Sequence, residues 1–367
     1  NFFFWDTAFT VIWGRYFLDS LPIENSLDNL YAARTEDGFI SREYNSMGEP
    51  IWDHNHPIAF APPLLTWAEL SLFELTSDVS RLKKVFPYLK AHHDFCTQQY
   101  QASDGLFIGD ALGSGMDNLK RYPKNWDFDN GGIELKPEWV HSMYRPHIDK
   151  LGPSHQFRWN SQGRWIDLSC QMALDAKCLS EMAKLINLEE ESEHYRKKHS
   201  NLAGIINDLC WNEDHQFYFD LGYGKQITRY HIGGYWALLA GIVPKSQQEG
   251  FISHLSDTKR FDTPVPVPSL SVSDPDFSGD GKYWRGSSWH PTTYMVIKGL
   301  EENGFREKAK EISVSCVKAN FILFKKTKTF WENLSPLKAE PGNPSQPDFC
   351  GWAGLSSVAI PREFLKG

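Results

Sequence analysis

The sequence lacks the long apolar run that a membrane-spanning helix needs. Such a helix takes about 18 or more consecutive apolar residues, and no run of that length occurs among the 367 residues. No targeting segment is recognisable either, and because residue 1 is asparagine and a helical pattern begins at once, we expect further chain upstream of it. These absences predict a soluble protein without a membrane partner.

Positive charge is also scarce. Lys and Arg number 38 against 46 Asp and Glu, which gives a net charge of −8, and the short segment 325–328 is the densest basic run. Proteins that bind nucleic acid carry a basic stripe or patch that neutralises phosphates. The charge balance therefore argues against nucleic acid as a partner, and it makes no prediction about the oligomeric state.

Cysteine is sparse and unpaired in pattern. None of the six forms a Cys-X-X-Cys motif, and several occupy apolar positions of helical patterns. A disulfide framework is typical of small secreted domains rather than of a chain this long. We therefore predict buried free thiols at all six positions, which are Cys96, Cys170, Cys178, Cys210, Cys316 and Cys350.

Signals for a metal or cofactor are weak. His54 and His56 lie two apart and His92 and His93 are adjacent, but no Cys or acidic ligand set accompanies either pair. Neither a phosphate-binding loop nor a dinucleotide-binding motif is present. The sequence thus predicts no metal and no cofactor.

Aromatic residues, by contrast, are abundant. They make up 14% of the chain, with 14 Trp, 14 Tyr and 24 Phe. Trp and Tyr combine a large apolar face with a polar group, so they suit a buried core and equally a cleft where sugar rings stack. Composition alone leaves both uses open.

Hydrophobic periodicity predicts an all-α fold. About ten helices follow one another as hairpins, with one small β-hairpin over 211–221 and a terminal helix that Pro361 should stop. Short connections alternate with long ones, which favours a closed double ring of helices in one domain, 1–367, with the long loops at one rim. The expected helices span 4–18, 22–33, 62–73, 79–100, 165–188, 189–209, 233–240, 246–255, 291–303, 305–323 and 355–360.

Residues 120–164 show no clear periodicity. A loop of that length in a compact domain is uncommon and is usually functional. We interpret it as a flap over a site; an insertion that merely covers one end of the fold is the alternative.

The first candidate for chemistry is Asp117, within the segment GSGMDN at 113–118. Glycine lets the backbone take positive φ and approach a ligand closely, so a carboxylate on this loop can point into a cavity. Asp117 could equally accept hydrogen bonds from its own backbone in a plain turn.

The second candidate is Glu332, which follows Phe330 and Trp331 and precedes a loop rich in Pro and Gly. That setting suits a pocket-facing carboxylate, although a surface glutamate at the end of an element fits as well. A third stretch, YWRGSSWHP at 283–291, places Trp284 and Trp289 around Arg285. It is either a grip for a sugar or a core of aromatic residues with the Arg paired to an internal acid.

Five short segments resemble one enzyme family. FFWD at 3–6, GSGMDN at 113–118, WRGSSW at 284–289, WEN at 331–333 and FCGW at 349–352 occur in the order typical of the catalytic domain of glycoside hydrolase family 63 and its trehalase and mannosylglycerate hydrolase relatives. The resemblance covers almost the whole chain. Met116 and the Leu-Ser-Pro at 334–336 depart from the common family pattern.

This resemblance implies an (α/α)6 barrel and an inverting glycosidase acting on a small α-linked glucoside, mannoside or similar glycoside. Asp117 matches the general acid and Glu332 the general base, whereas Asp110, Asp127 and Asp129 are rival acids nearby. The positions that match the lining of the sugar subsite are Trp5, Asp6, Trp284, Arg285, Gly286 and Trp352, beside the neighbouring Trp289.

Two other classes of function stay open at this point. A sugar epimerase or isomerase could use the same kind of barrel with histidines on the rim, for which His290 is the candidate. A carbohydrate-binding protein without catalysis would tolerate changes at Asp117. A small-molecule carbohydrate is the expected partner under each interpretation.

Overall fold

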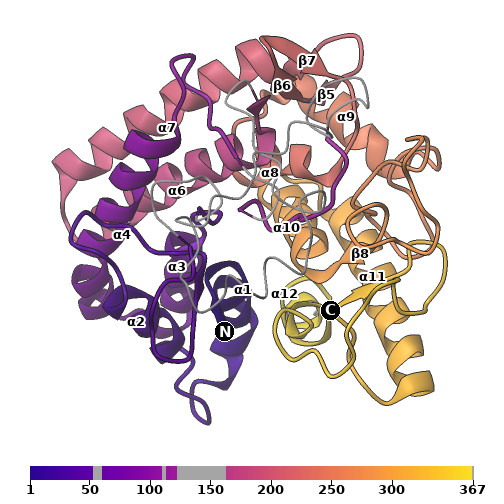
Figure 1. The fold of residues 1–367 in the computed structure, drawn as a ribbon, viewed down its shortest axis with the longest axis horizontal. Helices are drawn as coiled ribbons and strands as arrows, with labels where there is room; N and C mark the ends of the chain where they lie inside the picture. The colour runs from indigo at the N-terminus through magenta and orange to yellow at the C-terminus, as the bar shows by residue number, and fades with distance from the viewer. Residues whose placement is uncertain (53–59, 110–112, 122–162, 366–367) are drawn as a thin grey trace. The chain divides into compact units, whose positions relative to one another are not determined.

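The computed structural model describes residues 1–52, 60–109, 113–121 and 163–365, and it is mainly helical (Figure 1). The predicted flap over 120–164 lies almost entirely outside these described residues. The chain divides into two compact units. The first contains 1–117, 122–208 and 221–225, and the second contains 118–121, 209–220 and 226–367.

The first unit is built from helices that pack as neighbours. In it, α1 packs on α2 and α3, and α3 and α4 pack on α6. Strand β1 (Phe2–Phe3) pairs with β2 (Glu43–Tyr44) just before α1 begins. The helices are α1 (Phe4–Gly14), the 3-10 helix η1 (Arg15–Phe17), α2 (Asn25–Ala32), α3 (Leu65–Thr76), α4 (Val79–Tyr100), α6 (Ile166–Leu185) and α7 (Glu189–Cys210).

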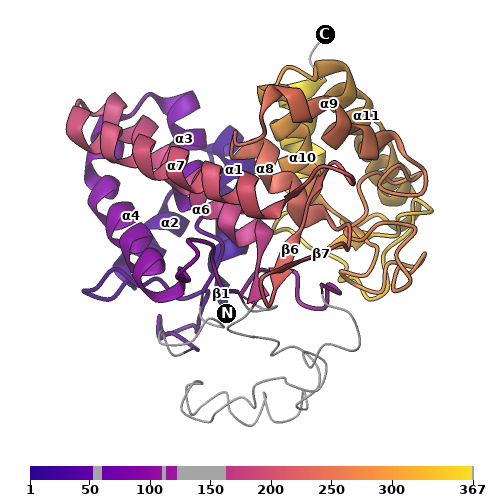
Figure 2. The same ribbon diagram turned by 90° about the horizontal axis from the view of Figure 1, so that it is seen from above.

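Helix α6 is the centre of the first unit. Fifteen of its 20 residues are buried, which is the pattern of a helix enclosed on nearly all sides. Helix α7 lies beside it in both views (Figure 1, Figure 2). Ser180 of α6 and Ser192 of α7 each donate a hydrogen bond to the other's carbonyl, at 2.8 and 2.9 Å. An inner helix is thus paired with an outer one.

The second unit repeats this arrangement. Helix α10 (His290–Glu302) has 10 of its 13 residues buried, whereas α11 (Arg306–Thr327) buries one face, and the two pack together. Helix α8 (Trp236–Leu239) also packs on α10. The remaining helices are η4 (Ile232–Tyr235), α9 (Lys245–Ser253), η5 (His254–Ser256), the π-helix η6 (Leu355–Ala359) and α12 (Ile360–Phe364).

Strand pairs in the described residues are short. The predicted hairpin is confirmed, since β4 (Trp211–Asn212) pairs with β5 (Phe217–Tyr218). Strand β8 (Ser288–Trp289) pairs with β9 (Asn333–Leu334). Strand β6 (Asp220–Gly222) lies between β3 (Gly163–Arg164) and β7 (Lys225–Ile227).

The expected helices are confirmed, with two local corrections to the sequence analysis. Pro361 does not stop the terminal helix: it lies in the first turn of α12, where the wide turn of η6 has just ended and a backbone N–H is not needed. Cys350 is exposed, because it lies in a loop and not on an apolar helix face, whereas the other five thiols are buried and free as predicted. No helix in the described part of the chain is long and apolar enough to cross a bilayer.

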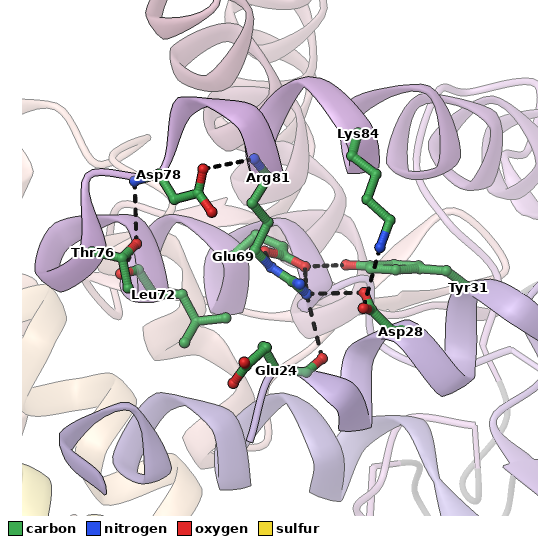
Figure 3. Close-up of polar contacts among 9 residues, drawn as sticks. All are labelled: Glu24, Asp28, Tyr31, Glu69, Leu72, Thr76, Asp78, Arg81 and Lys84. Carbon is green, nitrogen blue, oxygen red and sulfur yellow. Dashed lines mark hydrogen bonds and ion pairs between the residues drawn. The ribbon is translucent and has the colours of Figure 1, made fainter. Parts of the chain in front are cut away.

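One buried ion pair joins three helices of the first unit (Figure 3). Glu69 of α3 has no exposed surface, and Arg81 of α4 donates to its two oxygens at 2.7 and 2.8 Å. Tyr31 of α2 donates to Glu69 Oε1 at 2.9 Å, and Asp28 lies 3.3 Å from Arg81. Burial works against the charge on Arg81, but the hydrogen bonds and charge of Glu69 more than offset it and raise the pKa of Arg81. The guanidinium therefore stays charged at every accessible pH.

We expect Glu69→Ala to destabilise the protein by about 3–5 kcal/mol, because it leaves the Arg81 charge buried with its main partner removed. Urea unfolding would measure the change. The matched control is Glu193→Ala, which removes a similar two-bond contact with Arg196 on the surface of α7. Since solvent screens that pair, its removal should leave the urea midpoint unchanged. Equal effects of the two substitutions would contradict a stabilising role for the buried pair.

Candidate active site

The loop that carries Asp117 packs on an aromatic cluster of the first unit. Gly115 has φ +76°, so the positive φ expected of this loop is present. A Cβ added there would lie 3.1 Å from Trp5 Cδ2, so the loop approaches the indole more closely than most side chains allow. Trp5 in turn packs edge-on against Phe9, with ring centroids 4.9 Å apart.

Other residues of this loop fix its turn. Ser114 is buried and its hydroxyl accepts a hydrogen bond from the backbone N–H of Met116, while the Met116 side chain is fully buried. Asp117 follows as a half-buried residue. Asp6, in the first turn of α1 beside Trp5, is also half-buried. The structure thus gathers Trp5 and the Asp117 loop into one part of the first unit.

Glu332 is held in the second unit by hydrogen bonds to both its oxygens. The Tyr283 hydroxyl donates to Oε1 at 3.2 Å, and the backbone N–H of Gln346 donates to Oε2 at 3.3 Å. The side chain is 7% exposed. Burial raises the pKa of the Glu332 carboxyl above its usual value, and the two hydrogen bonds act in the opposite direction because they favour the charged form.

Aromatic residues form the wall behind Glu332. Trp284 and Trp289 stack in parallel with ring centroids 3.9 Å apart, and Tyr283 packs edge-on against Trp289 at 4.8 Å. Trp352 packs against Trp289 and donates its indole N–H to the carbonyl of Glu332 at 2.8 Å. The pairing of β8 with β9, with Trp289 opposite Asn333, brings these segments together. Trp284 and Trp289 are 1% exposed, so in the second unit they pack on each other.

Arg285 and Gly286 are tied into the same unit. Arg285 donates to Asp276 at 2.6 Å, and Asp276 also accepts from Arg229 at 2.7 Å. Gly286 has φ +150°, and a Cβ there would lie 2.5 Å from the carbonyl oxygen of Ser278, so only glycine fits. The internal acid that the sequence analysis kept open for Arg285 is therefore Asp276.

The paired histidines and His290 have structural partners. His92 contacts the carbonyl of Gly38 and His93 contacts Asp175, whereas His54 and His56 lie outside the described residues. Burial lowers the pKa of His290 to about 4, so its imidazole is neutral. Its Nε2 donates to the carbonyl of Trp331 at 2.9 Å and its Nδ1 accepts from Ser356 at 2.7 Å. Both nitrogens are thus engaged within the protein, and Nε2 holds the residue before Glu332.

Two residues contribute to the site without having been predicted from the sequence. Tyr283 directly precedes Trp284 and donates to Glu332, and Asn118 directly follows Asp117. Asn118 accepts from the backbone N–H of Trp284 at 2.8 Å and donates to the carbonyl of Lys282 at 3.1 Å. The only sequence feature that could have identified Tyr283 and Asn118 was their position next to Trp284 and Asp117.

Comparison with known proteins identifies the family. The profile of the mannosylglycerate hydrolase MGH1-like glycoside hydrolase domain family matches residues 1–353. An uncharacterized protein of Borreliella burgdorferi is 28% identical over 86% of this chain, and the mannosylglycerate hydrolase of Thermus thermophilus is 26% identical over 76% of this chain and 72% of its own length. The chain spans 60% of the length of the Borreliella relative.

A solved structure agrees in fold. A family 63 mannosylglycerate hydrolase from Thermus thermophilus, determined in complex with glucose, superposes with a TM-score of 0.74 at 18% identity, covering 98% of this chain and 92% of that one. The fold is therefore an all-α (α/α)6 barrel, as the sequence predicted. The chain belongs to the MGH1-like glycoside hydrolase domain family, within the group that the five motifs resemble.

The hydrogen bond from Tyr283 makes a prediction about the ionisation of Glu332. Tyr283→Phe removes a donor to the carboxylate, so the pKa of Glu332 should rise further above its usual value. Carbon-13 NMR titration of protein with labelled glutamate δ-carboxyls would measure it, with the resonance assigned by its loss in Glu332→Gln. Tyr218→Phe, which removes a hydroxyl bonded to Gln247, is the matched control and should leave this pKa unchanged. A fall in the pKa in Tyr283→Phe would contradict the proposed contact.

Proposed function

We propose that this chain is the catalytic domain of an inverting glycoside hydrolase that acts on a small α-linked glucoside or mannoside. The observation that carries the proposal is Glu332, a buried carboxylate that two donors keep ionisable within an aromatic wall. Family membership supports the same reaction class. Both units together, 1–367, would make up the single catalytic domain.

Glu332 is assigned as the general base. A base must be ionised to accept a proton from water, and a pKa that burial raises above the usual value makes the Glu332 carboxylate a stronger acceptor. Tyr283 and Gln346 hold its oxygens and so limit the directions in which the carboxylate can accept a proton.

Asp117 is assigned as the general acid. In the reaction, its proton passes to the leaving oxygen as the glycosidic C–O bond breaks. Glu332 removes a proton from the water that attacks the opposite face of the sugar, and the product has the inverted anomeric configuration. Such a reaction needs carboxyl groups about 6.5–9.5 Å apart, to leave room for that water. Proton exchange with solvent then restores both carboxyls.

The residues assigned to the sugar subsite are Trp5 and Asp6 from the first unit and Arg285 and Trp352 from the second. Trp284, Gly286 and Trp289 complete the set, and their burial and close packing suit a supporting wall. The flap over 120–164 remains a prediction. The epimerase alternative is disfavoured, because the buried His290 is neutral and uses both nitrogens within the protein.

Asp117→Asn and Glu332→Gln should each lower kcat by about 100- to 10,000-fold, because each removes one partner of the acid–base pair. The assay is anomer-resolved proton NMR with trehalose, kojibiose, nigerose, glucosylglycerate and mannosylglycerate, which reports both the substrate cleaved and the configuration released. Inversion is expected.

Asp94→Asn and Glu311→Gln are the controls, since Asp94 on α4 pairs with Lys198 and Glu311 on α11 pairs with Lys308, away from the assigned residues in the sequence. They should retain the parent activity. Parent-level turnover by either Asp117→Asn or Glu332→Gln would remove that residue from the proposed mechanism. Release of the retained anomer would exclude inversion, and binding of a sugar without any hydrolysis would favour the non-catalytic alternative.

A further inference from the structure

Asn118 uses its whole amide group to hold one short stretch of backbone. Its Oδ1 accepts from the N–H of Trp284 at 2.8 Å, and its Nδ2 donates to the carbonyl of Lys282 at 3.1 Å. These two contacts flank Tyr283, the residue whose hydroxyl donates to Glu332. A side chain that caps both sides of a residue fixes the position of that residue more tightly than either bond would alone.

The stretch that Asn118 holds is conformationally unfavourable. Lys282 has φ +36° and Tyr283 has φ +63°, and neither is glycine. Residues other than glycine in this region cost of order 1–3 kcal/mol each, and they persist only where surrounding contacts enforce them. The two hydrogen bonds from Asn118 are contacts of that kind. We expect their loss to let the backbone at Tyr283 relax and to weaken the contact between its hydroxyl and the carboxylate.

The segment that carries Asn118 is anchored at its other end as well. Arg121 is buried and donates to both oxygens of Asp220, at 3.2 and 3.1 Å. His231 contacts Asp220 Oδ2 at 2.9 Å through Nε2, and its Nδ1 accepts from the N–H of Gly233 at 3.2 Å. Residues 118–121 are therefore fixed to the second unit at both ends.

Asp117 immediately precedes this anchored segment. The chain passes from the first unit to the second between Asp117 and Asn118. The peptide bond between them is planar and rigid, so the hydrogen bonds of Asn118 restrict the backbone of Asp117 to few positions. We propose that Asn118 is a positioning residue: it holds Tyr283, and through it the carboxylate of the general base, and it restricts the backbone of the adjoining general acid.

This inference rests on the proposed function, and it assigns Asn118 no contact with the reacting atoms. Asn118→Ala removes both hydrogen bonds. Asn118→Asp keeps an acceptor for the Trp284 N–H but loses the donor to Lys282, so it should show a smaller loss of activity. It also serves as the second variant if the alanine protein does not fold. Circular dichroism and thermal unfolding would establish that each variant is folded.

The assay compares two leaving groups. One substrate is the glycoside that the parent cleaves, and the other is the α-glycosyl fluoride of the same sugar, whose leaving group departs with little help from a general acid. We expect Asn118→Ala to lower kcat about 10- to 100-fold on the glycoside with KM changed less than about twofold, and to lower the glycoside-to-fluoride activity ratio at least about fivefold. The acidic limb of its pH profile should move to higher pH, because the loss of the Tyr283 contact should raise the pKa of Glu332, as expected for Tyr283→Phe.

Asn303→Ala is the matched control. Asn303 is another amide of the second unit that bridges two segments, donating to the carbonyls of Leu238 and Gly299 at 3.0 and 2.8 Å. Its loss should lower the thermal midpoint and leave the activity ratio and the pH profile of the folded enzyme unchanged. A structural role alone for Asn118 would give this same pattern.

The outcomes separate the two proposals. An unchanged activity ratio in Asn118→Ala, or a rise in KM without a fall in kcat, would overturn the inference about Asn118. If Asp117→Asn and Glu332→Gln are inactive while Asn118→Ala behaves like Asn303→Ala, only this inference is wrong. If Asp117→Asn and Glu332→Gln keep the parent activity, the proposed function is wrong.

Discussion

The withdrawal of the Glu332 carboxylate from water is the constraint on which the second unit depends. A buried charge is costly unless hydrogen bonds compensate it. Here one donor comes from the backbone of Gln346 and the other from a tyrosine held in an unfavourable conformation. Both donors must themselves be held in place. Many polar contacts of the second unit accordingly lie in the segments 282–289 and 331–346.

Helices of two kinds provide that support. The inner helix α10 is buried on most of its surface and begins at His290, directly after strand β8. The outer helix α11 covers it with one face and leads towards Trp331 and Glu332. Because closely packed inner helices move little, the first residues of the loops that follow them are held in fixed positions. The first unit uses α6 and α7 in the same way.

Sequence periodicity predicted most of the helical framework for a physical reason. A helix that buries one face must repeat apolar residues every three or four positions, and α4 begins and ends at the predicted residues Val79 and Tyr100. The prediction failed at Pro361 because this proline lies in the first turn of a helix, where it is tolerated. It failed at Cys350 because this cysteine lies in a loop and not on an apolar helix face. Five motifs in order resembled the family, and two of their residues, Trp284 and Trp289, stack closely in the structure.

The contacts around Glu332 could not be predicted in the same way. Tyr283 and Glu332 lie on segments joined by the pairing of β8 and β9, and two-residue strands leave little pattern in a sequence. Lys282 and Tyr283 have positive φ although neither is glycine, so their residue types did not predict this backbone conformation. The hydrogen bonds of Asn118 to Lys282 and Trp284 depend on this backbone conformation. The sequence around Asn118 therefore gave no sign of its role.

The exposure of Cys350 has a practical consequence. The other five thiols are enclosed in the protein, so a maleimide dye would attach at one place on the folded chain. That place is two residues from Trp352, whose indole is bonded to the carbonyl of Glu332. Indoles quench many fluorophores on contact, and the emission of such a dye would therefore follow any rearrangement of this tryptophan in real time.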